Sequence, residues 1–182
     1  MKVPVNIVNI VLFNISWFAI VLSQSPLVAP IIVGIHLLLH WLVMGKGKDE
    51  LRLIGGVTLC GVVIDQLLFK TGVFNLGGQP AMAPLWLSCL WPIFASTLMH
   101  SLVGFQNKVA LAVVSGALGG ALSYIAGVRM SAVDFASPFW GPVLLGTLWA
   151  FMFPFLMQVA ARLQIQRDAL QSWSPPARRA FD

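Results

Sequence analysis

The chain has 182 residues, of which 58% are hydrophobic and only 9% are charged, and its formal net charge is +5 at pH 7. The mean hydropathy of +0.87 excludes an ordinary soluble domain, because so few polar residues cannot form a water-facing shell. The pI near 9.8 is compatible with a nucleic-acid binder. However, the basic residues stand singly between apolar segments, which indicates a membrane protein, so we predict no nucleic-acid partner.

Six apolar segments follow one another along the chain. Crossing the hydrocarbon core of a bilayer takes roughly 20 apolar residues as a helix. The segments that approach this length are 5–23, 27–44, 51–69, 84–103, 109–127 and 138–161. The first is long for a cleaved signal peptide and is followed closely by Pro26, so we expect it to remain as a helix. The sequence therefore predicts an all-α integral membrane protein, a bundle of six transmembrane helices.

The distribution of Lys and Arg sets the expected orientation of this bundle. If the N-terminus is cytoplasmic, nine of these residues lie on the cytoplasmic side, and only Lys70 and Arg129 lie on the outer side. The positive-inside rule then places both termini in the cytoplasm. We divide the chain into a transmembrane domain, 1–161, and a cytoplasmic basic amphipathic tail, 162–182, whose arginines would lie near anionic headgroups.

Small residues and prolines indicate how the helices pack. Gly116 and Gly120 form a GxxxG pattern, which lets a second helix approach closely. We favour packing within the monomer over a dimer interface, and we predict no particular oligomeric state. Pro92 and Pro154 lie inside predicted spans, so each should free a carbonyl, that of Ser88 or of Ala150, and kink its helix.

Asp65 is the one carboxylate that lies well inside an apolar segment, and a charge at membrane depth is by default a candidate site. An ion pair with Arg129 would neutralise it, and a protonated carboxyl is the alternative. At similar depth lie further polar and aromatic candidates for ligand binding, namely Gln66, Trp86, Trp91 and Tyr124. Two interpretations stay open, a site for a ligand, proton or lipid headgroup and a purely structural polar anchor.

A second polar cluster is expected nearer the cytoplasmic side. Its members are His36, His40, Thr97, His100 and Ser101. Two histidines at i and i+4 can bind a metal, but no glutamate lies between them and no carboxylate partner is evident. We therefore predict hydrogen bonds between helices, with Ser101 and the face of Asn6 and Asn9 as partners. No metal or other cofactor is predicted.

No catalytic signature is found in the sequence. A nucleophile elbow, a phosphate-binding loop, HExxH and a dinucleotide fingerprint are all missing. The sequence therefore names no catalytic residue and gives no support for an enzyme, although membrane enzymes often lack such motifs.

An ordered series of segments resembles an uncharacterised family of bacterial inner-membrane proteins, domain of unknown function 2878. These segments are 61–68, 85–91, 94–102 and 116–127, together with Trp149 and Pro154. Two departures are Ala121, where the family often has proline, and Gly104-Phe105, where an aromatic–aliphatic pair is usual. The resemblance implies a multi-pass protein of the bacterial inner membrane with no assigned activity. Its members are often encoded near cyclopropane-fatty-acid-synthase-like methyltransferases and flavin oxidoreductases.

Three functions remain in competition. The resemblance favours a ligand- or lipid-binding accessory of membrane-lipid modification, with membrane lipids as ligands and lipid-modifying enzymes or other membrane proteins as partners. A small-solute transporter or substrate-capture subunit also fits six short spans, and a scaffold without a ligand is the third alternative. The lipid function predicts a lateral opening between helices at the outer polar cluster. Transport predicts a closed midplane cavity that reaches one face and is lined by Asp65, and a scaffold predicts a fully paired Asp65 with no cavity.

Overall fold

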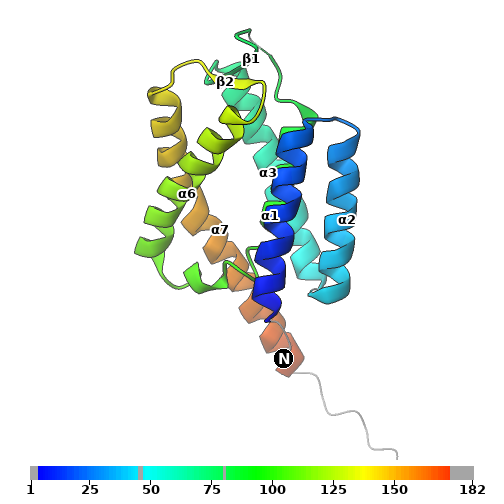
Figure 1. Ribbon diagram of the computed structural model, residues 1–182. Helices are drawn as coiled ribbons and strands as arrows, with labels where there is room; N and C mark the ends of the chain where they lie inside the picture. The colour runs from blue at the N-terminus through cyan, green and yellow to red at the C-terminus, as the bar shows by residue number, and fades with distance from the viewer. Residues whose placement is uncertain (1–3, 45–46, 80, 173–182) are drawn as a thin grey trace, which may run out of the picture.

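The structure is a computed structural model that describes residues 4–44, 47–79 and 81–172, and it is mainly helical (Figure 1). Its elements in chain order are α1 (Val5–Ser23), α2 (Val28–Val43), α3 (Lys48–Lys70), β1 (Phe74–Leu76), α4 (Leu85–Ser88), α5 (Leu90–Ala95), the 3-10 helix η1 (Val103–Phe105), α6 (Val109–Arg129), β2 (Val133–Phe135) and α7 (Trp140–Ser172). By length and composition, α1, α3, α6 and α7 can cross a membrane. The helical class is confirmed, while six spans and cytoplasmic termini stay predictions.

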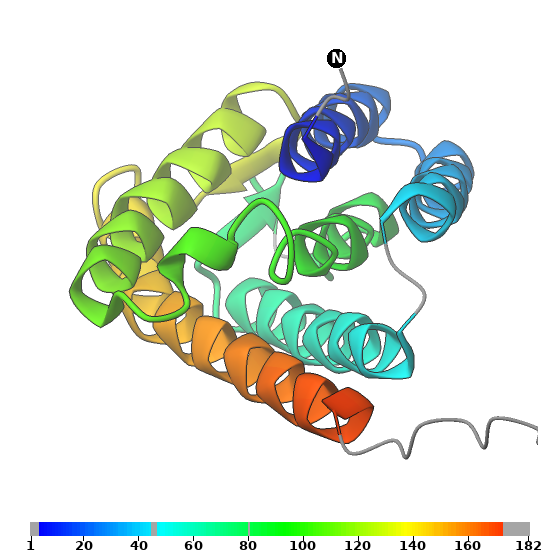
Figure 2. The same ribbon diagram turned by 90° about the horizontal axis from the view of Figure 1, so that it is seen from below.

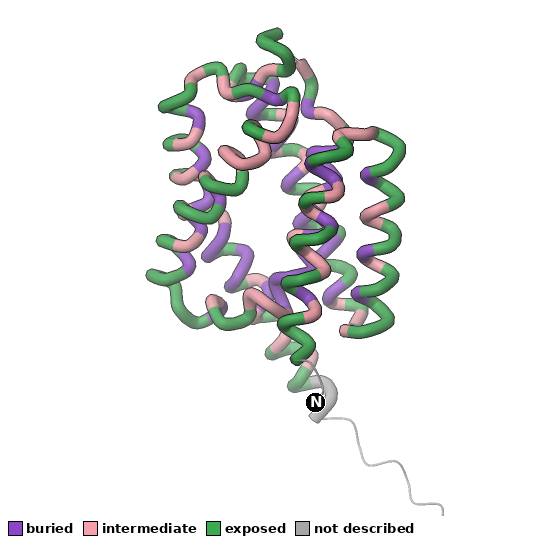
Figure 3. Tube along the Cα trace, viewed as in Figure 1, coloured by how far each residue is buried: buried purple, intermediate pink, exposed green. Residues whose placement is uncertain are grey.

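Large apolar side chains cover the outside of the bundle. Exposed residues run along α1, α2 and α6 (Figure 3). Ile15, Leu42 and Leu122 are each more than 60% exposed. Monomeric soluble proteins rarely carry apolar surface on this scale. The exposed surface and the four long apolar helices together indicate a membrane protein.

The fourth predicted span is not one continuous helix. The segment 84–103 forms α4 and α5, followed by a series of turns that leads to η1. Pro92 has no N–H to donate to the Ser88 carbonyl, and α4 ends at Ser88. Seen along the bundle, this broken segment lies between α1, α2 and α3, and α5 packs against all three helices (Figure 2). The prediction of a single helix over 84–103 is wrong, and the proline that was expected only to kink it explains the break.

Two short strands, which were not predicted, join the loops that follow α3 and α6 (Figure 1). β1 and β2 are antiparallel, with Phe74 opposite Phe135. Three residues are too few for an alternating pattern to stand out in the sequence. Phe74 is buried and stacks on the Tyr124 ring, with ring centroids 5.6 Å apart. The strands therefore close the end of the bundle where the Asp65 site lies.

α6 and α7 form a tight helical hairpin. A Cβ atom added to Gly120 would clash with the side chain of Trp149, and one added to Gly116 would clash with the Trp149 carbonyl and with Phe153. The GxxxG pattern therefore packs against α7 of the same chain, as expected for the intramolecular alternative. The absence of a side chain leaves space for the Trp149 side chain at Gly120, and for the α7 backbone and Phe153 at Gly116.

α7 runs past the predicted end of the transmembrane domain. The expected boundary between 161 and 162 falls inside α7, which continues as far as Ser172. Gln164 Nε2 donates to the Met99 carbonyl at 3.1 Å, so this part of α7 packs against the turns after α5. The tail's remaining residues, 173–182, lie outside the described residues. The cytoplasmic location of the tail stays a prediction.

Candidate functional site

Asp65 is completely buried on the inner face of α3. Trp91 Nε1 donates to Oδ2 at 2.6 Å, and the Tyr124 hydroxyl donates to Oδ1 at 3.0 Å. Each carboxylate oxygen therefore has its own donor, one from α5 and one from α6. A buried carboxylate needs such partners, because an unpaired charge in an apolar interior is strongly unfavourable.

Glycines fix the position of the Trp91 ring. A Cβ atom on Gly61 would overlap the Trp91 indole, so this ring lies directly on the α3 backbone. On its other side Trp91 stacks on Trp149, with ring centroids 5.7 Å apart and planes 3° from parallel. Trp149 in turn fills the space beside Gly120. This stack of two indoles between α3 and α6 aims the Trp91 N–H at Asp65.

A cavity of about 340 Å³ lies beside this carboxylate, and we call it the lateral cavity. Asp65, Trp91 and Tyr124 form part of its wall, which also includes side chains of α1, of the α4–η1 segment and of α7. Its α6 wall consists largely of glycine and serine. The lining residues Ile10, on α1, and Gly119, on α6, are exposed at the molecular surface. The cavity therefore opens at the side of the bundle, between α1 and α6.

The other residues predicted for this site have different positions. Trp86 is buried and lines the lateral cavity. Gln66 is not in its wall; its side-chain amide exchanges two hydrogen bonds with the backbone of Ala83, at 3.1 and 3.2 Å. Arg129 is exposed at the end of α6. Among the described residues no ion pair joins Arg129 to Asp65, so the predicted pair is wrong and two neutral donors take its place.

The second predicted cluster is brought together as a hydrogen-bonded network at the other end of the bundle. Asn9 is completely buried, and its Oδ1 accepts from both the backbone N–H and the hydroxyl of Ser101, at 3.2 and 2.6 Å. His36 bridges Ser16 and Ser96, with 2.9 Å on each side. The predicted hydrogen bonds between helices are thus confirmed for Asn9, whereas Asn6 is exposed.

Two further members of the predicted cluster, Thr97 and His100, have different surroundings. The Thr97 hydroxyl donates to the Phe94 carbonyl at 2.6 Å, and Thr97 also lines the lateral cavity. His100, in the turns after α5, contacts the His40 ring edge-on at 5.0 Å between centroids. Thr97 therefore belongs to the wall of the lateral cavity, whereas His100 contacts His40.

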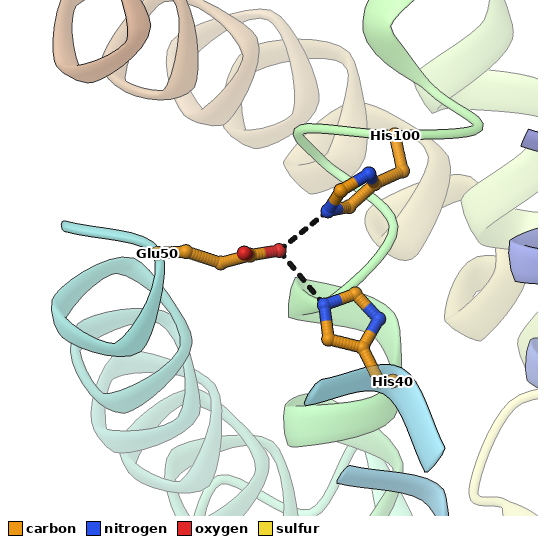
Figure 4. Close-up of side chains that lie close together, drawn as sticks. All are labelled: His40, Glu50 and His100. Atoms are coloured by element: carbon orange, nitrogen blue, oxygen red, sulfur yellow. Dashed lines mark hydrogen bonds and ion pairs between the residues drawn. The ribbon is translucent and has the colours of Figure 1, made fainter. Parts of the chain in front are cut away.

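Glu50 is a central residue of this cluster that the sequence analysis missed. Its Oε1 lies 2.8 Å from His40 Nε2 and 2.6 Å from His100 Nε2, so the two imidazoles converge on one carboxylate oxygen (Figure 4). Glu50 is only 6% exposed. The predicted span 51–69 begins just after Glu50, but α3 begins at Lys48 and carries Glu50 in its first turn. Helical spacing back from Asp65 through Gly61, Ile54 and Leu53 was the signal that could have revealed it.

Comparison with known families adds one finding. The model of the family described as protein of unknown function (DUF2878) matches residues 6–155. The chain belongs to the DUF2878 family. No curated protein and no solved structure matches it significantly. The DUF2878 match spans the lateral cavity and the cluster of His40, Glu50 and His100, and the family description gives no activity.

Proposed function

We propose that this DUF2878 protein binds the acyl chain of a membrane lipid in the lateral cavity and serves as an accessory of membrane-lipid modification. The observation that supports this most is the place where the cavity opens. Beside its mouth, Val11 and Ile15 of α1 and Leu118 and Leu122 of α6 are exposed. Such a surface faces lipid tails rather than water in a membrane protein. A molecule that enters between α1 and α6 therefore comes from the bilayer.

The wall of the cavity fits a hydrocarbon chain. Aromatic rings, among them those of Phe13, Trp17 and Phe94, face the glycines and serines of α6. A volume of about 340 Å³ lies within the range of roughly 300–1,000 Å³ that is usual for ligand sites. The space is large enough for part of one lipid. The lining has few polar groups that could bind a strongly polar solute.

The polar end of the cavity constrains which part of a lipid can lie there. The N–H of Trp91 and the O–H of Tyr124 both donate to Asp65, so neither donor is left for a ligand. The Tyr124 oxygen can still accept a hydrogen bond. The buried Trp149 N–H, which lies near Tyr124 in the same wall, has no acceptor at hydrogen-bond distance among the described residues. A ligand hydroxyl suits this position, whereas a carboxylate or phosphate would face the Asp65 carboxyl oxygens, whose two donors are already used. We therefore expect the acyl region and a hydroxyl-bearing group, rather than an anionic headgroup.

The competing functions fit the structure less well. A scaffold was expected to show a paired Asp65 and no cavity; Asp65 is paired, but the cavity is present. A solute transporter was expected to show a closed midplane cavity that reaches one face and is lined by Asp65; Asp65 does line the cavity, but the exposed lining residues lie at its side. The family resemblance adds support from a different direction, because genes for fatty-acid-modifying enzymes often lie near those of family members.

Gly119 offers a direct test of acyl-chain binding. It lines the cavity, and no atom lies within 4 Å of a Cβ added there, so leucine can fill the space without displacing the fold. The probe is a phosphatidylglycerol whose acyl chain ends in a photoreactive diazirine, mixed with the purified protein in detergent. We expect Gly119→Leu to lose most of the covalent labelling seen with the wild type.

Gly34→Leu is the matched control for this experiment. Gly34 also has open space around its Cβ position, but it lies on α2, away from the cavity wall. We expect this variant to be labelled like the wild type. Equal labelling of Gly119→Leu and Gly34→Leu would show that the lateral cavity does not hold the acyl chain.

A further inference from the structure

We infer that His40, Glu50 and His100 form a binding site for a divalent transition-metal ion of the Zn²⁺ class. Three ligand atoms from three separate elements converge there, His40 Nε2 from α2, Glu50 Oε1 from α3 and His100 Nε2 from the turns after α5 (Figure 4). All three lie within 4.8 Å of one another. Residues far apart in the sequence thus present the donor atoms that such an ion requires.

The donor set is selective for a class of ion. Imidazole nitrogen suits zinc and its first-row neighbours, whereas magnesium and calcium prefer sites built from oxygen alone. Two histidines and one glutamate are the protein ligands of several zinc sites that leave a fourth position for solvent. The sequence analysis found no carboxylate partner for the histidines, and Glu50 supplies it.

Charge supports the same conclusion. Glu50 and His40 are both buried, and among the described residues the only ion-pair partners of Glu50 are His40 and His100. No described Lys or Arg forms an ion pair with this carboxylate: Arg52 pairs with Asp49, and Arg167 pairs with Asp168. A buried carboxylate needs positive charge close by. A bound dication provides that charge while both imidazoles stay neutral.

There is room for a solvent ligand beside these residues. A small cavity of about 40 Å³ is lined by His40 and Glu50, and its wall also includes Trp41, Leu51 and Ile54. A water molecule needs only about 10–15 Å³ of such volume. The small cavity therefore accommodates the fourth ligand that a site with three protein ligands leaves open.

Asn9 contacts the other ring nitrogen of His40, Nδ1. Its Nδ2 lies 3.5 Å from His40 Nδ1, and its Oδ1 is held by Ser101. Binding a metal through Nε2 places the imidazole proton on Nδ1, where metal-bound histidines donate to an outer acceptor. Loading the site therefore requires the Asn9 amide to turn and present its oxygen to His40, which breaks its bonds to Ser101 and the bond from Nδ2 to the Ser96 carbonyl.

The test is zinc binding by the purified full chain in detergent. The protein is stripped with a chelator, titrated with Zn²⁺ alone, desalted and measured by elemental mass spectrometry. We expect one equivalent per chain for the wild type, and a melting temperature that rises with Zn²⁺. Glu50→Gln and His100→Gln should weaken binding by more than the about 10–100-fold that the loss of an outer partner costs.

His36→Gln is the control for these variants. His36 lies one turn before His40 and is completely buried, but its ring nitrogens bond Ser16 and Ser96 rather than Glu50. We expect it to keep one equivalent of zinc. His100 is the least buried of the three ligands, so His100→Gln tests the site even if changes at His40 or Glu50 prevent folding. A wild type without stoichiometric zinc, or variants that bind as well as the wild type, would show that the cluster is only hydrogen-bonded.

Discussion

Glu50 and Asp65 lie on the same buried face of α3, separated along its axis by about 22 Å at the usual rise per residue. Asp65 holds Trp91 of α5, and Glu50 holds His100 in the turns that follow α5. Pro92 interrupts the central segment between α4 and α5, because it cannot donate to the Ser88 carbonyl. α3 therefore fastens this segment at both ends through buried carboxylates, which explains why charges are kept in such an apolar chain.

The Asp65 anchor can be tested with Asp65→Asn. The new amide can accept only one of the two hydrogen bonds and turns its NH₂ group toward the other donor. We expect the free energy of unfolding to fall by about 1–3 kcal/mol, the usual cost of an unsatisfied buried polar group. Labelling by the photoreactive lipid should fall as well, because Trp91 and Tyr124 lose their fixed positions. Asp134→Asn, at an exposed position, is the control; unchanged labelling in Asp65→Asn would reduce Asp65 to a packing residue.

The two neighbouring glycines of α6 should respond to alanine in opposite directions. Gly120→Ala forces a methyl group into the Trp149 ring, and overpacking of this kind costs about 1–3 kcal/mol. Gly119→Ala meets no atom within 4 Å and should be neutral or stabilise the helix by up to about 1 kcal/mol. Thermal unfolding in detergent measures both. Equal melting temperatures for the two variants would mean that α6 and α7 are not packed through Gly120.

Most of the long helices could be predicted from the sequence, because apolar length is a strong signal. The first segment was predicted as 5–23 and is Val5–Ser23, and α6 extends the predicted 109–127 only to Arg129. The prediction of one helix over 84–103 was wrong because hydropathy does not indicate whether a proline kinks a helix or ends it. Glu50 was missed because a run of three charged residues is typical of a loop, whereas tertiary contacts extend α3 across it.

The site could be predicted only in part for a similar reason. Membrane depth brought Asp65, Trp91 and Tyr124 into one group, and the structure joins these three. Depth does not report direction around a helix axis, so Gln66, the next residue in α3, was grouped with them although it faces the Ala83 backbone. Arg129 was predicted as the partner of Asp65 because buried charges are usually paired. The hydrogen bonds to Asp65 come instead from the neutral donors Trp91 and Tyr124.

Gln66 should therefore affect folding and not ligand binding. Gln66→Leu removes both hydrogen bonds to the Ala83 backbone, at about 0.5–1.5 kcal/mol each. We expect a lower melting temperature with lipid labelling that matches the wild type at a temperature where both are folded. Labelling that disappears while the melting temperature stays the same would instead make Gln66 a ligand-binding residue.

The predicted orientation can be measured with single cysteines in a Cys60→Ala, Cys89→Ala background. Ala136 follows β2 and Asn107 precedes α6, and both are exposed at opposite ends of the bundle. The positive-inside rule predicts that a membrane-impermeant thiol reagent, added to spheroplasts, labels Ala136→Cys and spares Asn107→Cys. The reverse labelling pattern would mean that the protein has the opposite orientation in the membrane. Labelling of both cysteines would contradict the expected number of spans.

The most direct measurement is an experimental density map of the protein in nanodiscs made from bacterial phospholipid. Acyl-chain binding predicts elongated density that enters between α1 and α6 and ends near the Tyr124 hydroxyl, with Asp65 still bonded to Trp91. A map in which the side chains of α1 and α6 close the lateral cavity, or in which it holds no elongated density, would contradict the proposed function.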